Sequence, residues 1–136
     1  MSTKKKTEEL NGMLEFNILS VKNEERCEKS YHRIKSWSPT DWACALAGEV
    51  GEACNFVKKL KRLDSDVFWI GEFSRCNNTK TKDEEEKILI ESIGKELADV
   101  VIYADLLASR LGLRLGYEVK KKFNETSDVI GSPIKL

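Results

Sequence analysis

The chain has 136 residues, 40% of them hydrophobic, and its 23 lysines and arginines balance 23 aspartates and glutamates. This length predicts a single domain, residues 1–136, with a real core, and the balanced charge argues against a general nucleic-acid binder, which would carry a basic excess. No stretch approaches the roughly 20 apolar residues of a membrane span, and four cysteines without C-x-x-C spacing fit free thiols, so we expect a cytoplasmic protein without a membrane partner.

Long patterns of period 3.6 and only two prolines predict an all-α protein. The N-terminal helical region, residues 7–36, has an imperfect apolar stripe of Leu10, Met13, Leu14, Leu19 and Val21. Ser38, Pro39 and Asp41 then form a strong helix start, with serine as the N-cap and proline in the first position. That helix runs to about residue 62, with an expected apolar stripe of Leu46, Val50, Ala53, Val57 and Leu60.

Residues 63–82 show no clear period and read as a long loop, either functional or partly disordered. Thr81 and Glu84 form a second capping box, and the helix they open runs to about residue 111 before Gly112. Its expected apolar stripe is Ile93, Leu97, Val100, Ala104, Leu107 and Leu111. A last helix over about 115–124 and an irregular tail, 125–136, complete an antiparallel bundle of about four helices.

Two acidic pairs stand out because apolar and small residues surround them: Glu49 with Glu52, and Glu96 with Asp99. Residues three apart share one face of a helix, so each pair presents two carboxylates together, beside its apolar stripe. Other pairs at this spacing lie in polar surroundings and read as solvated faces. Four converging carboxylates repel one another unless protons or a cation neutralise them, and hard oxygen ligands suit Mg²⁺, with Mn²⁺ as a possible substitute. Gly48 and Gly51 fit close approach by a ligand and tight helix packing equally well.

These residues resemble the MazG-like branch of the all-α NTP pyrophosphatases, whose pattern is E-x-x-E, a spacer and E-x-x-D. Glu49 to Glu52 and Glu96 to Asp99 supply both halves, and Lys120 with Asn124 matches the K-x-x-x-N of the family's last helix. The likeness covers about residues 38–124. The spacer is longer than usual, so residues 63–82 are an apparent insertion between the two metal-binding helices, and the tail lacks the arginine and tyrosine often seen there.

The resemblance implies a Mg²⁺-dependent enzyme that cleaves a nucleoside or deoxynucleoside triphosphate between its α and β phosphates, releasing the monophosphate and pyrophosphate. Glu49, Glu52, Glu96 and Asp99 would hold Mg²⁺ on the triphosphate, and one glutamate would help to activate water. Such an activity serves house-cleaning or control of the nucleotide pool. The resemblance also implies that the protein forms a homodimer or homotetramer.

Further residues are candidates for contact with the substrate. The resemblance assigns phosphate contacts to Lys120 and Asn124. Lys59 follows Glu52 by two helical turns and is the best placed of the nearby cations, although cations at a helix C-terminus also favour its dipole. Trp37, Trp42 and Tyr103 offer faces on which a base can stack, and each can equally be a core or interface residue.

Two alternatives remain open from the sequence. The same fold can act on a damaged nucleotide or an alarmone. A second possibility is a non-catalytic helical module in which the carboxylates bind a structural cation or a basic partner.

Overall fold

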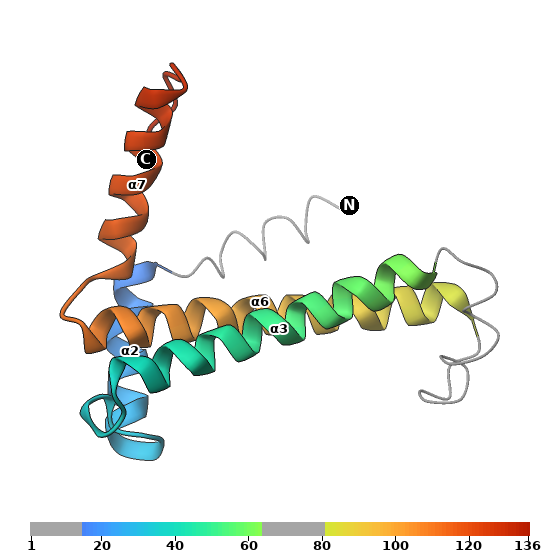
Figure 1. The fold of residues 1–136 in the computed structure, drawn as a ribbon, viewed down its shortest axis with the longest axis horizontal. Helices are drawn as coiled ribbons and strands as arrows, with labels where there is room; N and C mark the ends of the chain where they lie inside the picture. The colour runs from blue at the N-terminus through green and yellow to red at the C-terminus, as the bar shows by residue number, and fades with distance from the viewer. Residues whose placement is uncertain (1–14, 64–80) are drawn as a thin grey trace. The chain divides into compact units, whose positions relative to one another are not determined.

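The computed structural model describes residues 15–63 and 81–136, and every regular element in these ranges is helical. These ranges hold four α-helices, α2 (Phe16–Ser30), α3 (Pro39–Leu63), α6 (Lys82–Arg110) and α7 (Leu115–Val129) (Figure 1). One short 3₁₀ helix, η1 (Ile34–Ser36), lies between α2 and α3. The all-α prediction is confirmed. The chain divides into two compact units, unit 1 (residues 1–39 with 105–136) and unit 2 (residues 40–104).

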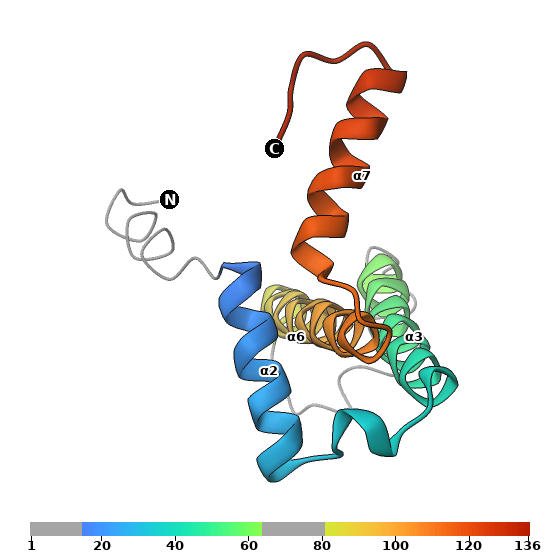
Figure 2. The same cartoon turned by 90° about the vertical axis from the view of Figure 1, so that its left-hand side faces the viewer.

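Unit 2 (residues 40–104) is built on α3 and the part of α6 up to Ala104, which run antiparallel and side by side (Figures 1 and 2). At one end the rings of Trp42 and Tyr103 have centroids 6.3 Å apart. At the other end Leu63 and Leu89, each 2% exposed, pack together with Phe56 and Leu60 beside them. We call the line of residues through which the two helices meet the seam.

The seam differs from the expected apolar stripes. Seam positions on α3 are Trp42, Leu46, Glu49, Ala53, Phe56, Leu60 and Leu63, all buried or half-buried. Val50 and Val57, expected in the core, are 44% and 50% exposed, and Leu97 of α6 is 54% exposed. The expectation that the acidic pairs lie beside the packed face is therefore wrong for Glu49 and Glu96, because each helix is rotated so that these carboxylates take seam positions.

The ends of α6 follow the signals in the sequence. The Thr81 Oγ1 accepts the Glu84 N–H at 3.2 Å, while the Glu84 carboxylate accepts the Thr81 N–H at 3.1 Å, which is a reciprocal capping box. At the other end Gly112 has φ +75°, and the Leu113 N–H donates to the Ala108 carbonyl at 2.8 Å. This is a Schellman end, in which glycine takes the left-handed conformation without a Cβ clash.

In unit 1, α2 is held by polar side chains rather than by an apolar stripe. Asp105, 1% exposed, accepts hydrogen bonds from Ser20 Oγ at 2.5 Å and Asn23 Nδ2 at 3.1 Å. Glu24 accepts from Ser109 Oγ at 2.7 Å and from Arg114 at 2.9 Å. Val21, expected in the stripe, is 59% exposed, while Leu10, Met13 and Leu14 lie outside the described residues. The stripe predicted for this region is wrong at Val21, because Ser20, Asn23 and Cys27 take the buried face.

α2 also contacts α7, and Gly116 permits the approach, since a Cβ there would lie 2.6 Å from the Phe16 Cβ. α7 continues to Val129, five residues beyond the predicted end, so the expectation of an irregular tail from 125 is wrong as far as Val129. The reason is a second Schellman end at Gly131, with φ +68° and the Ser132 N–H donating to the Ser127 carbonyl at 2.8 Å. Residues 132–136 then return along α7, where the Leu136 N–H donates to Asn124 Oδ1 at 2.9 Å.

The predicted loop at 63–82 falls almost wholly on residues outside the described ranges. At its edges only Leu63, the last residue of α3, and Thr81 and Lys82, at the start of α6, are described. None of the described helices combines the length and hydrophobicity that crossing a bilayer requires.

Candidate metal centre

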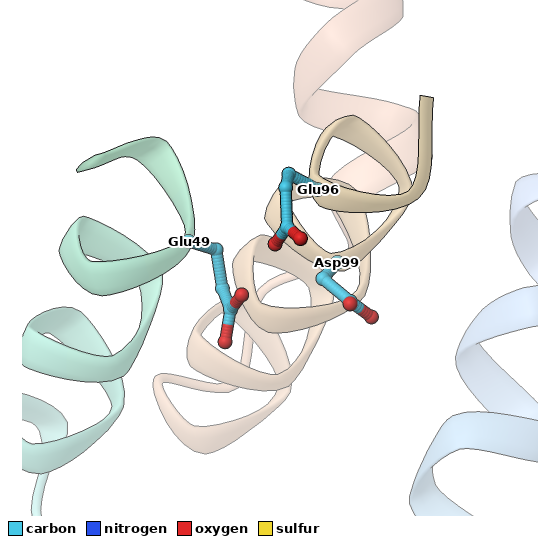
Figure 3. A group of neighbouring side chains, drawn as sticks. All are labelled: Glu49, Glu96 and Asp99. Atoms are coloured by element: carbon cyan, nitrogen blue, oxygen red, sulfur yellow. The ribbon is translucent and has the colours of Figure 1, made fainter. Parts of the chain in front are cut away.

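Three carboxylates converge in unit 2, midway along the seam between α3 and α6. Glu49 of α3 and Glu96 and Asp99 of α6 each offer a carboxylate oxygen, and these oxygens all lie within 4.8 Å of one another. Figure 3 shows Glu49 facing Glu96 across the space between the two helices, with Asp99 one turn further along α6. All three side chains are half-buried. We call these three residues the carboxylate cluster.

The spacing of residues along each helix determines which face these carboxylates occupy. Glu49 lies seven residues after Trp42 and seven before Phe56, and Glu96 lies seven after Leu89 and seven before Tyr103. Seven residues are close to two turns of an α-helix, so members of each trio share one face. Because the outer members of each trio pack in the seam, the middle glutamates are held there too.

Burial and neighbouring negative charges dominate the electrostatics of Glu49. The pKa of Glu49 is raised above its usual value, first by desolvation and then by the negative charges of Asp99, Glu52 and Glu96, with a hydrogen bond to Glu96 adding to the shift. Like charges this close favour protonation of one group or binding of a cation. The cluster therefore has the donor chemistry of a site for a hard divalent ion.

Glu52, the fourth predicted carboxylate, lies near the cluster without belonging to it. Its side chain is exposed, and its charge contributes to the raised pKa of Glu49. Glu52 precedes the seam residue Ala53, so it projects to one side of the seam rather than into it. The structure thus brings three of the four predicted carboxylates together and leaves the fourth open to solvent beside them.

The other predicted residues of unit 2 have different surroundings. Lys59 precedes the seam residue Leu60, on the same side as Glu52, and its ammonium lies 5.0 Å from the centre of the Phe56 ring. Trp42 is 0% exposed, so its ring is a core element here rather than an open stacking surface. Tyr103 is half-buried against it.

Trp37, Lys120 and Asn124 belong to unit 1, and their contacts with a substrate stay predictions. Trp37 is half-buried and stacks on His32 with ring centroids 4.3 Å apart. Lys120 is exposed on α7. The Asn124 amide exchanges two hydrogen bonds with the backbone of Leu136, donating at 3.3 Å and accepting at 2.9 Å.

Sequence reasoning found the residues of the cluster but misplaced them relative to the packed face. The sequence does carry a signal for the packed position of the two glutamates. It is the seven-residue spacing of Leu89, Glu96 and Tyr103, and of Trp42, Glu49 and Phe56. A search for apolar residues alone overlooks it, because the carboxylates occupy positions of the same heptad.

Comparisons of this chain with protein-family models, with curated proteins and with solved structures give no match.

Proposed function

We propose that this chain is a Mg²⁺-dependent nucleoside triphosphate pyrophosphohydrolase, which converts a triphosphate to a monophosphate and pyrophosphate. The observation that carries the proposal is the convergence of Glu49, Glu96 and Asp99 from two helices, with a raised pKa at Glu49. These three are among the residues on which the resemblance to the MazG-like enzymes rests.

The cluster fits Mg²⁺ by the chemistry of its donors. Mg²⁺ prefers carboxylate oxygens and keeps several ligand positions for water and substrate phosphates, so a small, half-buried set of carboxylates suits it better than a closed cage. When bound, the ion would neutralise phosphate oxygens and position the substrate. Glu49, Glu96 and Asp99 would be its protein ligands.

The residues around the cluster suggest the side from which a substrate approaches. Glu52 and Lys59 each precede a seam residue, and Lys95 precedes Glu96, so all three project to one side of the hairpin. On that side Gly48 leaves open space, since apart from its own stretch of helix no described residue places an atom within 4 Å of where its Cβ would be. A triphosphate arriving there would find Lys59 and Lys95 for its charge and Glu52 to orient water.

The test is release of pyrophosphate from a panel of canonical and modified NTPs and dNTPs in the presence of Mg²⁺, with orthophosphate followed in parallel. We expect pyrophosphate and a monophosphate from one or a few nucleotides, and no orthophosphate. Glu96→Gln and Glu52→Gln should each abolish turnover while leaving the helical circular dichroism spectrum unchanged, because each removes a charge without changing size.

The matched control is Glu91→Gln, an exposed glutamate of the same helix outside the cluster, which should keep wild-type turnover. Normal activity in Glu96→Gln would show that the cluster is not the active site. If the wild type releases no pyrophosphate from any nucleotide of the panel but is stabilised by Mg²⁺, the proposed activity is overturned in favour of a metal-stabilised binding module.

A further inference from the structure

One side of α7 in unit 1 forms an apolar groove together with the residues that follow the helix. The groove has a volume of about 630 Å³, and its apolar lining consists of Leu115, Val119, Phe123, Ile130 and Ile134. Val119 and Phe123 are 39% and 41% exposed. Ile130 and Ile134 are 69% and 66% exposed. A continuous apolar surface of this kind marks an interaction site.

The described chain begins at one end of this groove. Phe16, the first residue of α2, lies against Gly116, since a Cβ there would be 2.6 Å from the Phe16 Cβ. Gly116 directly follows Leu115, which is the first residue of α7 and lines the groove. Glu15 has an extended backbone, with φ −79° and ψ 136°, so α2 does not continue back through it. Residues 1–14 are therefore attached beside the groove and need not follow the axis of α2.

Residues 1–14 are long enough to follow the groove along its length. From Leu115 to Ile130 the groove extends for about 22 Å, given the rise per residue of an α-helix. The segment that precedes Glu15 measures about 21 Å as a helix and about 46 Å when extended. Because it is joined to the chain at the edge of the groove, its effective concentration there is on the order of millimolar. Attachment and length thus favour this segment over a separate molecule as the occupant.

The apolar residues of the segment match those of the groove. Leu10, Met13 and Leu14 have the spacing i, i+3, i+4, which places them on one face of a helix. Thr7 is a favourable N-cap for such a helix. A helix this short is not stable alone in water, so its formation requires that its apolar face packs against another surface. The lining of the groove offers that surface.

The charges also match when the segment runs antiparallel to α7. Lys122 lines the groove seven residues beyond the start of α7. Counted back from the start of α2, at the same end of the groove, Glu9 is seven residues away and Glu8 is eight. The equal rise of two helices brings both carboxylates beside Lys122. Glu118 also lines the groove and falls opposite Met13, so it meets no like charge there.

We propose that residues 7–14 form a short helix that lies antiparallel to α7 in this groove, with Leu10, Met13 and Leu14 on the apolar lining. The occupant is thus a segment of the same chain. Lys120 and Asn124 are not among the described residues that line the groove, so the docked segment leaves them uncovered. The inference does not rest on the proposed function, and either can fail while the other holds.

The first test is chemical cross-linking within the full chain, read by mass under denaturing conditions. The background keeps the buried Cys27 and removes the competing thiols by Cys44→Ser, Cys54→Ser and Cys76→Ser. Leu10→Cys is then combined with Val119→Cys, and the variant is treated with a short bismaleimide. In the proposed arrangement these two positions lie within one helical turn of each other along the groove. We therefore expect an intramolecular cross-link.

The matched control combines Leu10→Cys with Tyr117→Cys. Tyr117 is 66% exposed and lies two residues before Val119, so it faces the opposite side of α7. The Val119 pair should react about 10-fold faster or more, because docking raises the effective concentration on one side of the helix only. Equal rates in the two variants would show a segment that does not occupy the groove. Predominantly covalent dimers would show that a second copy occupies it; either result overturns the proposal.

The second test is hydrogen–deuterium exchange of the full chain, which needs no cysteine substitutions. The amides of residues 10–14 should exchange about 10-fold more slowly than those of an unstructured peptide. Val119→Asp should abolish this protection, whereas Tyr117→Asp should keep it. Unchanged protection of α3 and α6 shows that each variant is folded. A wild type whose residues 10–14 exchange at the unstructured rate overturns the proposal, as does a Val119→Asp variant that protects them like the wild type.

Discussion

Glu49 makes the apo protein's stability depend on pH in a direction opposite to that of most carboxylates. Its pKa is raised in the folded state, so between the usual value of 4.5 and the raised value the folded protein binds more protons than the unfolded chain. The free energy of unfolding therefore falls as pH rises through this window. Glu49→Gln removes this contribution and should be more stable than the wild type at neutral pH in the absence of metal.

Urea denaturation in the presence of EDTA, from about pH 4 to pH 8, measures this difference. The gain of Glu49→Gln over the wild type should shrink toward the acidic end, where Glu49 itself is protonated. Glu91→Gln should show no such trend. A Glu49→Gln variant that is less stable than the wild type at neutral pH would contradict the assignment of desolvation and repulsion to the ionised Glu49 carboxylate.

Asp105 is a second single residue whose replacement should change the stability of the protein. It is buried with Ser20 and Asn23, which are 4% and 3% exposed, and both donate to its carboxylate. Asp105→Ala removes the acceptor of these two buried donors and should lower the free energy of unfolding by about 1–3 kcal/mol. Asp128→Ala, at an aspartate whose side chain is 75% exposed, should change it by less than about 0.5 kcal/mol. Equal effects in urea denaturation would show that the α2 contact does not rest on Asp105.

Among whole elements, α6 depends on its N-terminal capping box. Thr81→Ala removes the side-chain acceptor of the Glu84 N–H and should cost about 1 kcal/mol of stability. Thr81→Ser keeps the hydroxyl and should retain most of it. Thermal denaturation followed by circular dichroism distinguishes the two, and a Thr81→Ala variant with the melting temperature of Thr81→Ser would show that the cap is dispensable.

The helices could be predicted from the sequence wherever a local signal exists. Pro39, the Thr81–Glu84 box and Gly112 mark ends that the structure has at the expected places. The end of α7 was missed because the polar residues 125–128 follow the predicted end of the helix and read as the start of a tail. The rotation of α3 and α6 was missed for a different reason: it depends on which face meets the other helix, and Val50 and Leu97 match an apolar stripe as well as Leu46 and Ile93 do.

The candidate site was predictable in composition and only partly in geometry. Spacing alone grouped Glu49 with Glu52 and Glu96 with Asp99, since residues three apart share a face. Which of them meet across the seam depends on the tertiary pairing of α3 with α6. This pairing brings Glu49 to Glu96 and Asp99 and leaves Glu52 exposed.

At the scale of the whole molecule, Mg²⁺ that binds the carboxylate cluster should stabilise the folded protein against unfolding. A ligand that binds only the folded state at 100 times its dissociation constant stabilises by about 2.7 kcal/mol. We expect Mg²⁺ to raise the melting temperature of the wild type and to have little effect on a Glu96→Gln/Asp99→Asn variant. Differential scanning calorimetry with Mg²⁺ or EDTA measures the shift, and an equal rise in both proteins would place the ion elsewhere.

The heptad position of the cluster has a consequence for how this fold can be redesigned. Leucine at positions 49 and 96 would continue the apolar contacts made by Trp42, Phe56, Leu89 and Tyr103, turning the seam into an ordinary helical interface. Such a protein should gain thermostability and should not be stabilised by Mg²⁺ at this position. Stability alone therefore favours leucine at these two seam positions, which is why carboxylates there support the proposal of a role other than folding.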